Sequence, residues 1–243
     1  MIFGGHIEGR FKVGQIAIRP KVDTSFTDEL IIQIVGKGGH AARPHETVDA
    51  ILVGSLFVTA LQNIISRNIN PTTPTVISIG AFHAGTVFNA VADEATLKGT
   101  IRNTDKKTRD LVIRKIKKIA EAFAALHDAK IDVEIIEGYP QVVNHPGCYS
   151  LARDTAEEMF GKDNVVNLGK PSMGGEDFAY YLQRIPGCFI RLGAGGEGVV
   201  PAAHSSTFDF NEEVIRVGGA FFAELARRAI GNLRKGSASG GRA

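Results

Sequence analysis

The sequence is poor in cysteine, with two residues, Cys148 and Cys188, in a chain of 243. Two cysteines cannot form a disulfide framework, and no Cys-x-x-Cys spacing indicates a thiolate metal site. Buried thiols in a reducing compartment are the simplest interpretation, so we predict a cytoplasmic protein. The sequence also shows no stretch of about 20 apolar residues and no charged start followed by an apolar signal core. We therefore expect neither a membrane segment nor a secretion signal.

The sequence also has no marked excess of positive or negative charge, because the formal net charge is +2. Lysine and arginine are scattered rather than clustered, so the sequence shows no electrostatic footprint for nucleic acid. The densest basic run, residues 114–118, falls in an apolar-periodic segment and is best explained as the solvated face of a helix. A hydrophobic content of 44% and a charged content of 22% are ordinary for a globular chain.

Hydrophobic periodicity predicts a closed structural pattern between residues 24 and 137. Strand patterns at 28–35, 76–80, 94–102 and 131–137 alternate with two amphipathic helical patterns. Thr47 is the expected N-cap of the first helix, and Thr104-Asp105 begins the second, which runs to about His127. The order β-α-β-β-α-β is that of a split βαβ sandwich, one sheet covered by two helices.

The flanking segments have a different character. We expect a strand at 11–20, and then helices and short strands alternate from Cys148 onward, with a final helix at 211–233. This alternation predicts part of an α/β layered sheet that has too few strands to be complete. The expected boundaries are therefore 1–23 and 138–234 for the layered domain, 24–137 for the inserted domain and 235–243 for a Ser/Gly-rich disordered tail.

Glycine-flanked polar clusters stand far apart in this sequence. His6 follows Gly4-Gly5, His40 lies in 36–45, and Gly174-Gly175-Glu176-Asp177 precedes His204. Histidines and carboxylates presented by glycine turns are typical of a metal or catalytic site assembled from distant segments. Each has an ordinary alternative: a lone histidine is usually a surface or core residue, and paired carboxylates often cap a helix N-terminus.

Six motifs in order resemble one family, the dinuclear-metal amidohydrolases that include aminoacylases, hippurate hydrolases and related carboxypeptidases. They are Gly39-His40-Ala41-Ala42-Arg43-Pro44-His45, Phe88-Asn89-Ala90-Val91-Ala92-Asp93, Gly99-Thr100-Ile101-Arg102, Gly174-Gly175-Glu176-Asp177-Phe178, Pro186-Gly187 and Ala203-His204-Ser205. The resemblance runs from about Gly4 to Leu233. It implies an α/β fold: a partial three-layer catalytic α/β domain interrupted by an α+β, ferredoxin-like lid domain.

The resemblance also implies a role for each matching residue. His6 and His204 correspond to metal ligands, and His40 corresponds to the residue that stabilises the transition state, often in the partner subunit's site. Asn89 and Arg102 would hold the substrate carboxylate, although Arg102 could instead form a surface ion pair at a strand edge. Gly175 and Glu176 would line the substrate pocket, and Glu176 is not expected to be the general base.

The implied activity is metal-dependent hydrolysis of the amide bond of N-acyl amino acids or small peptides. It would use two divalent ions, zinc or manganese, in a homodimer formed through the lid domain. The family carries a longer N-terminal segment with further ligands and the general base, so we expect this chain to be inactive alone. The alternatives are a non-catalytic dimerisation or binding remnant and a carboxypeptidase of the same family.

Overall fold

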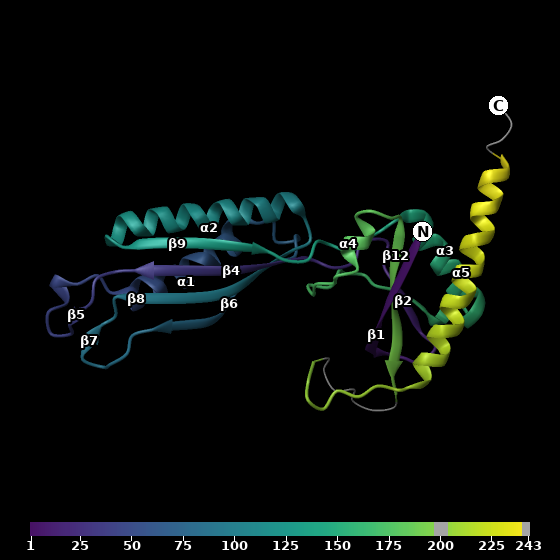
Figure 1. Ribbon diagram of the computed structural model, residues 1–243, viewed down its shortest axis with the longest axis horizontal. Coiled ribbons are helices and arrows are strands. Elements are labelled where there is room, and N and C mark those ends of the chain that lie inside the picture. The colour runs from purple at the N-terminus through teal and green to yellow at the C-terminus, as the bar shows by residue number, and fades with distance from the viewer. Residues whose placement is uncertain (197–203, 240–243) are drawn as a thin grey trace. The chain divides into compact units, whose positions relative to one another are not determined.

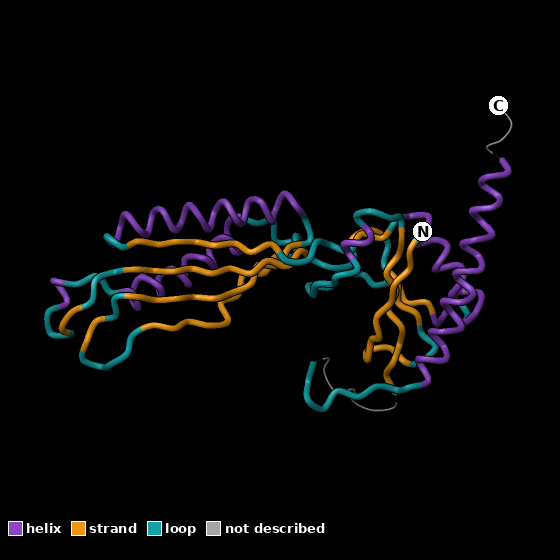
Figure 2. Tube along the Cα trace, viewed as in Figure 1, coloured by secondary structure: helices purple, strands orange, loops and turns teal. Residues whose placement is uncertain are grey.

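The computed structural model describes residues 1–196 and 204–239 of the chain, with backbone only for 233–239. These residues form two compact units: unit 1 takes Met1–Asp23, Val142–Pro171 and the chain from Glu176, and unit 2 takes Thr24–Gln141 and Ser172–Gly175. The mixed α/β class predicted from the sequence is confirmed. Figure 1 labels the elements, and Figure 2 separates helices from strands by colour.

Unit 2 contains a four-stranded antiparallel sheet with the order β6-β8-β4-β9. One face is apolar and packs on two helices, because leucine and isoleucine alternate with polar residues along the strands. A small two-stranded sheet of β5 and β7 lies at one end (Figure 1). The elements are β4 (Phe26–Val35), β5 (Gly39–His40), α1 (Ala50–Asn63), β6 (Thr75–Ala84), β7 (Ala90–Val91), β8 (Glu94–Asn103), α2 (Lys106–His127) and β9 (Lys130–Glu137).

Helix α1 begins later than the sequence suggested. Asp49, not Thr47, is its N-cap, and the Asp49 carboxylate accepts hydrogen bonds from the amides of Ile51 and Leu52. The helix continues through one π-helical turn, Ile64–Asn68. In the described part of the chain, Ala50–Asn68 is the one helical stretch long and apolar enough to cross a bilayer, contrary to our expectation of none. Its buried residues, including Phe57 and Leu61, belong to the unit 2 core, which accounts for that composition.

A buried ion pair ties α2 to the centre of the sheet. The Arg109 guanidinium donates to both carboxylate oxygens of Asp28, over 2.7 Å from Nε and 2.8 Å from Nη2. The two side chains are 10% and 1% exposed. Arg109 also stacks on the Phe26 ring, with its guanidinium carbon 5.2 Å from the ring centroid. Asp105 caps the same helix, as predicted, by accepting from the Thr108 amide.

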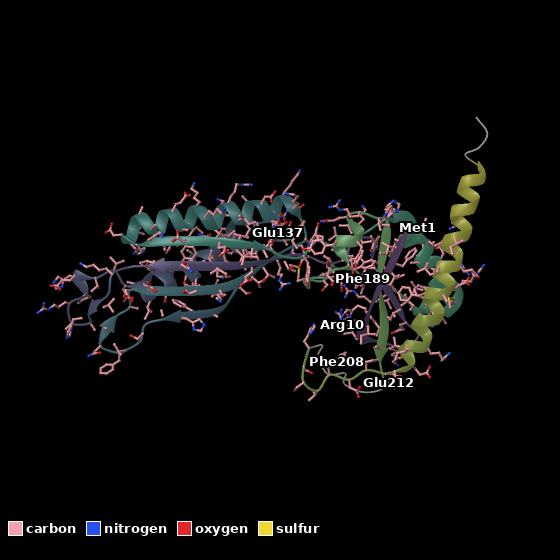
Figure 3. The ribbon with its side chains drawn as sticks, viewed as in Figure 1. Met1, Arg10, Glu137, Phe189, Phe208 and Glu212 are labelled. Atoms are coloured by element: carbon pink, nitrogen blue, oxygen red, sulfur yellow. The ribbon has the colours of Figure 1, made fainter. Side chains whose placement is uncertain are left out.

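Unit 1 is built on a mixed sheet with the order β1-β12-β2-β11, and a two-stranded ladder of β3 and β10. Helices α3 and α5 share one apolar core with this sheet. The short helix α4 packs against Phe189 (labelled in Figure 3), which alternates with the core-facing Ile190 on β12. The elements are β1 (Ile2–Lys12), β2 (Ile16–Ile18), β3 (Lys21–Val22), β10 (Val143–Asn144), α3 (Pro146–Phe160), β11 (Val165–Asn167), α4 (Ala179–Leu182), β12 (Gly187–Gly195) and α5 (Glu213–Ser239).

Three expectations for unit 1 need correction. The first strand covers Ile2–Lys12 rather than beginning near residue 11, because parallel pairing with β12 overrides the weak local propensity of its glycines. Helix α5 continues to Ser239, through most of the tail expected to be disordered, and residues 240–243 lie outside the described part. The helices of the described residues do not complete three layers, so the three-layer arrangement stays a prediction.

Candidate functional site

His6 and Glu176, 170 positions apart in the sequence, come together in unit 1. His6 is exposed on β1, where its Nδ1 lies 2.6 Å from the Ile7 carbonyl oxygen. Burial raises the pKa of the Glu176 carboxyl, against the lowering effects of the Phe178 amide and the nearby His6 ring. That amide donates to Glu176 over 3.4 Å, and Phe178, the N-cap of helix α4, makes no side-chain capping hydrogen bond.

The absence of a side chain at Gly4 lets the Phe178 ring lie close to strand β1, which carries His6. A Cβ on Gly4 would lie 2.6 Å from the Phe178 ring, so the ring rests directly on the β1 backbone. Gly175 serves a similar purpose in unit 2, where a Cβ would lie 2.7 Å from Thr27 and 3.0 Å from Tyr139. The close approaches explain two of the glycines that marked these clusters in the sequence.

His204 lies in a turn with φ of 67° and is exposed. The structure shows no contact between His204 and His6, and Ala203 lies outside the described residues. Within 1–196 and 204–239, no three histidine, cysteine, aspartate or glutamate side chains are grouped as a metal site. The described residues therefore do not fit a complete metal centre.

His40 and Asn89 lie together on the small sheet at one end of unit 2. His40 pairs with Ala90, and the Ala41 amide donates to the Asn89 carbonyl oxygen over 3.1 Å. The Ala42 amide donates to His40 Nδ1 over 3.0 Å. Because Nδ1 accepts, the proton of the neutral imidazole must be on Nε2, which leaves an exposed N–H donor.

Arg102 lies on strand β8 of the four-stranded sheet, at the end far from β5 and β7. It pairs in register with Thr27, at the end of the sheet where Glu137 is labelled in Figure 3. Its Nε donates to Thr100 Oγ1 over 2.9 Å. Among the described residues Arg102 forms no ion pair, so the expected alternative of a surface ion pair is not observed.

The two ends are too far apart for one ligand. Strand β8 runs from the end next to β7 to the end that holds Arg102, and Glu94 and Arg102, eight positions apart, are separated by about 26 Å at roughly 3.3 Å per residue. Asn89 and Arg102 of one chain therefore cannot bind the same carboxylate. The prediction that they act together therefore requires the two residues to come from different copies of the chain.

Sequence analysis missed charged groups at both sites. In unit 1 Arg191 is the β12 neighbour of His6, and its Nη2 donates to the buried Asp23 over 2.9 Å. In unit 2 Glu29 and Lys98 line a hollow with Arg102. An arginine inside the apolar run of 188–192 was a visible signal for the first, whereas nothing in the sequence distinguished Glu29 or Lys98 from other surface charges.

Comparison with known proteins identifies the family. Residues 1–228 match peptidase family M20/M25/M40, and the chain belongs to this family. YhaA of Bacillus subtilis (strain 168), which its name assigns provisionally to the amidohydrolases, is 40% identical over 93% of this chain and 57% of its own length. The N-acetyldiaminopimelate deacetylase of Streptococcus pneumoniae serotype 19F (strain G54) is 38% identical over 93% of this chain and 59% of its own length.

Solved structures agree. The Bacillus subtilis YXEP protein, described as a dinuclear metal binding peptidase of the M20 family, has a TM-score of 0.76 at 29% identity, covering 93% of this chain and 56% of that one. A protein of methicillin-resistant Staphylococcus aureus, provisionally described as an aminohydrolase, has a TM-score of 0.80 at 29% identity, covering 92% and 58%. The chain thus spans under two thirds of the length of these relatives.

Proposed function

We propose that this chain is part of an amidohydrolase that cleaves the amide bond of N-acyl amino acids or small peptides. Membership of the M20/M25/M40 family and the names of the amidohydrolase and deacetylase relatives support this proposal. The observation that carries it is the exposed Nε2–H of His40, because amide hydrolysis requires a donor to the oxyanion of the tetrahedral intermediate.

His40 would stabilise the transition state by donating from Nε2. As the scissile carbonyl becomes tetrahedral, its oxygen gains negative charge, and a donor already held in place needs no reorganisation. The Ala42 amide fixes both the tautomer and the direction of the ring. Arg102 would bind the carboxylate of the substrate, since a guanidinium oriented by Thr100 still offers two nitrogens for a bidentate pair.

The separation of His40 from Arg102 supports an active site shared by two copies of the chain. In this proposal His40 and Asn89 of one copy join Arg102 and Gly175 of the other. A symmetric homodimer would then contain two equivalent sites. Helix α1 offers a surface for such contact, because Ile51, Leu52 and Leu56 are 45%, 54% and 42% exposed on it.

We predict that Leu52→Glu together with Leu56→Glu weakens this dimer by at least about tenfold, since two charges would be desolvated at its interface. Sedimentation equilibrium of the full chain measures the change. Ile215→Glu, at a side chain 68% exposed on α5 in unit 1, is the matched control and should leave the association constant unchanged. Equal association of all three proteins would remove α1 from the interface.

Metal ions would activate the hydrolytic water when bound. We propose two divalent ions, zinc or manganese, with His6 and His204 each supplying one imidazole. One imidazole per ion is fewer than the three or four protein ligands of a stable zinc site. The described residues thus supply only some of the ligands that a metal centre needs, and we propose that this chain alone is inactive.

We accordingly predict weak metal binding by this chain, with a dissociation constant above roughly 10 µM for zinc, because an incomplete ligand set gives up most of the affinity of a full site. Calorimetric titration with zinc and with manganese measures it. His83→Ala, at an exposed histidine of β6, serves as the control for His6→Ala. Tight stoichiometric binding that His6→Ala abolishes would show that the chain holds a complete site.

A non-catalytic dimerisation or binding module is the second candidate, favoured because the described residues group no three potential metal ligands together. The two candidates differ in an assay of N-acetyl amino acid hydrolysis with added zinc or manganese. The assay is made with the longer N-terminal segment of the family supplied. Hydrolysis that a chelator abolishes supports the amidohydrolase, whereas metal-independent dimerisation without turnover supports the module. Release of a C-terminal residue from peptides would identify the carboxypeptidase alternative.

A further inference from the structure

Phe88 is the most exposed large apolar side chain in the described part of the chain, with 99% of its surface accessible. Val87 beside it is exposed as well, and so are Ile51 and Leu52 in the first turn of α1. Single apolar residues on a surface are normal, but several around one loop mark a place that contacts an apolar group. A phenylalanine ring in water also forgoes the stabilisation that its burial would give.

The loop of residues 85–89, between β6 and β7, is held at both of its ends. At its start Gly85 has a φ of 68°, and a Cβ there would lie 3.4 Å from Ile51 Cδ1, so the loop rests on the start of α1. At its end the Asn89 carbonyl oxygen accepts from the Ala41 amide over 3.1 Å. The aromatic ring at the tip of this loop is therefore presented from a fixed backbone.

Phe88 lies within reach of the ligand that His40 would contact. His40 pairs with Ala90 in the small sheet of β5 and β7 (Figure 1). Paired Cα atoms of antiparallel strands are about 5 Å apart, and two residues of chain add at most about 7 Å. The Cα atoms of Phe88 and His40 are thus within about 13 Å of each other, so their side chains can contact neighbouring groups of one small ligand.

The bonds at the scissile carbonyl decide which group of the substrate lies beside the ring. The carbonyl carbon carries an oxygen, the nitrogen of the amino acid and the acyl chain. In the function proposed above, His40 donates to the oxygen, and Arg102 of the other copy binds the carboxylate on the nitrogen side. The acyl chain is the remaining substituent, and the copy that supplies His40 also supplies Phe88.

We propose that Phe88 of one copy contacts the acyl chain of a substrate bound at the site of the other copy, where it determines acyl specificity. The substrate class is then N-acyl amino acids whose acyl chain is apolar and longer than acetyl, because a single methyl group covers little of an aromatic ring. This rests on the proposed function in one respect, that His40 and Asn89 enter the site of the other copy.

A series of acyl chains measures this contact once the longer N-terminal segment of the family is supplied to this chain. From N-acetyl- through N-butanoyl- to N-hexanoyl-alanine, kcat/KM should rise by about two- to fourfold for each added methylene, the range for partial to full burial of that group. Phe88→Ala should remove most of this rise, and Phe88→Leu, which keeps an apolar side chain, should retain most of it. Ile230→Ala, at an exposed apolar residue of α5, is the control and should keep the full rise.

Two results of the acyl series would overturn the proposal. One is a parent protein that hydrolyses all three substrates equally well, or a rise that persists in Phe88→Ala. The other is a loss in Phe88→Ala of the same size for every acyl chain, accompanied by weaker association in sedimentation equilibrium. That result would assign Phe88 to the contact between the copies and remove it from the substrate.

Mixed dimers decide which copy supplies the ring. When His6→Ala and His40→Ala chains associate, with the same N-terminal segment supplied, the intact site takes His40 from the His6→Ala copy. Phe88→Ala added to that copy should abolish the preference for hexanoyl over acetyl. The same substitution added to the His40→Ala copy should leave the preference in place. The reverse pattern would place Phe88 in the site of its own chain and overturn the proposal.

Failure of this proposal can be told apart from failure of the proposed function by calorimetric titration of the same preparation. If nothing is hydrolysed, but N-hexanoyl-alanine binds more tightly than N-acetyl-alanine and Phe88→Ala abolishes the difference, the contact is supported and the amidohydrolase activity is overturned. If both compounds are hydrolysed with equal kcat/KM, the activity is supported and the role of Phe88 is overturned. Equal binding without hydrolysis would overturn both.

Discussion

Replacing His40 with alanine should lower kcat by about 10²- to 10³-fold, with little change in KM, once the longer N-terminal segment of the family is supplied to this chain. The range is that for losing one donor to a tetrahedral oxyanion, an interaction formed only in the transition state. The defect is expected because the Ala42 amide donates to His40 Nδ1, which holds the ring and leaves its Nε2–H exposed for donation. Steady-state kinetics on an N-acetyl amino acid measures the change.

Arg102→Ala supplies the contrast, because it should act mainly on KM for substrates with a free carboxylate and spare those whose carboxylate is amidated. His45→Ala, at an exposed histidine on the short turn after His40, is the control and should leave both constants close to those of the parent. An unchanged kcat for His40→Ala would show that another group stabilises the oxyanion.

Replacing Arg109 with methionine should destabilise unit 2 by about 3–5 kcal/mol, the cost of leaving a buried charge without its partner. Asp28 is 1% exposed and accepts both of its strong hydrogen bonds from Arg109. The partial exposure of the guanidinium places the expected value toward the lower end of this range. Urea unfolding followed by circular dichroism gives the free energy.

Two further variants test the cause of that loss. Asp28→Met combined with Arg109→Met should recover much of the stability, because it removes both charges together. Lys106→Met removes the exposed pair with Asp110, whose side chains are 70% and 40% exposed, and should cost less than about 1 kcal/mol. If Arg109→Met cost no more than Lys106→Met, the buried pair would not hold α2 to the sheet.

Periodicity predicted the secondary structure of unit 2 well because its elements are long and one-sided. The stripe of α2 and the alternating strands β4, β8 and β9 bury the residues that the pattern selects. Unit 1 was harder to predict from sequence. Strand β1 contains Gly4-Gly5 and three charged residues beyond His6, and its strand state depends on pairing with β12, 185 positions away in sequence. Pairing of that kind leaves no local signal.

The candidate site residues were likewise predictable from local sequence, whereas their positions relative to one another were not. Glycine flanks identified His6, His40 and Gly175 because a close backbone approach restricts side-chain size, and that restriction is visible in sequence. The distance between His40 and Arg102 was not visible, because both motifs are short and their spacing depends on the length and register of β8. The charges of the hollow depend on the same register, since a shift of one residue would turn Glu29 toward α2.

The most direct test of a shared active site is complementation between two inactive variants, His6→Ala and His40→Ala, each supplied with the longer N-terminal segment of the family, coexpressed and purified together without separating the dimers. If His40 of one copy serves the site that holds His6 of the other, each mixed dimer contains one intact site. Random assembly should then restore roughly a quarter of the parent activity, since half of the dimers are mixed and half of their sites are intact. Activity no higher than that of the separate variants would contradict the account and place His6 and His40 of a single chain in the same site.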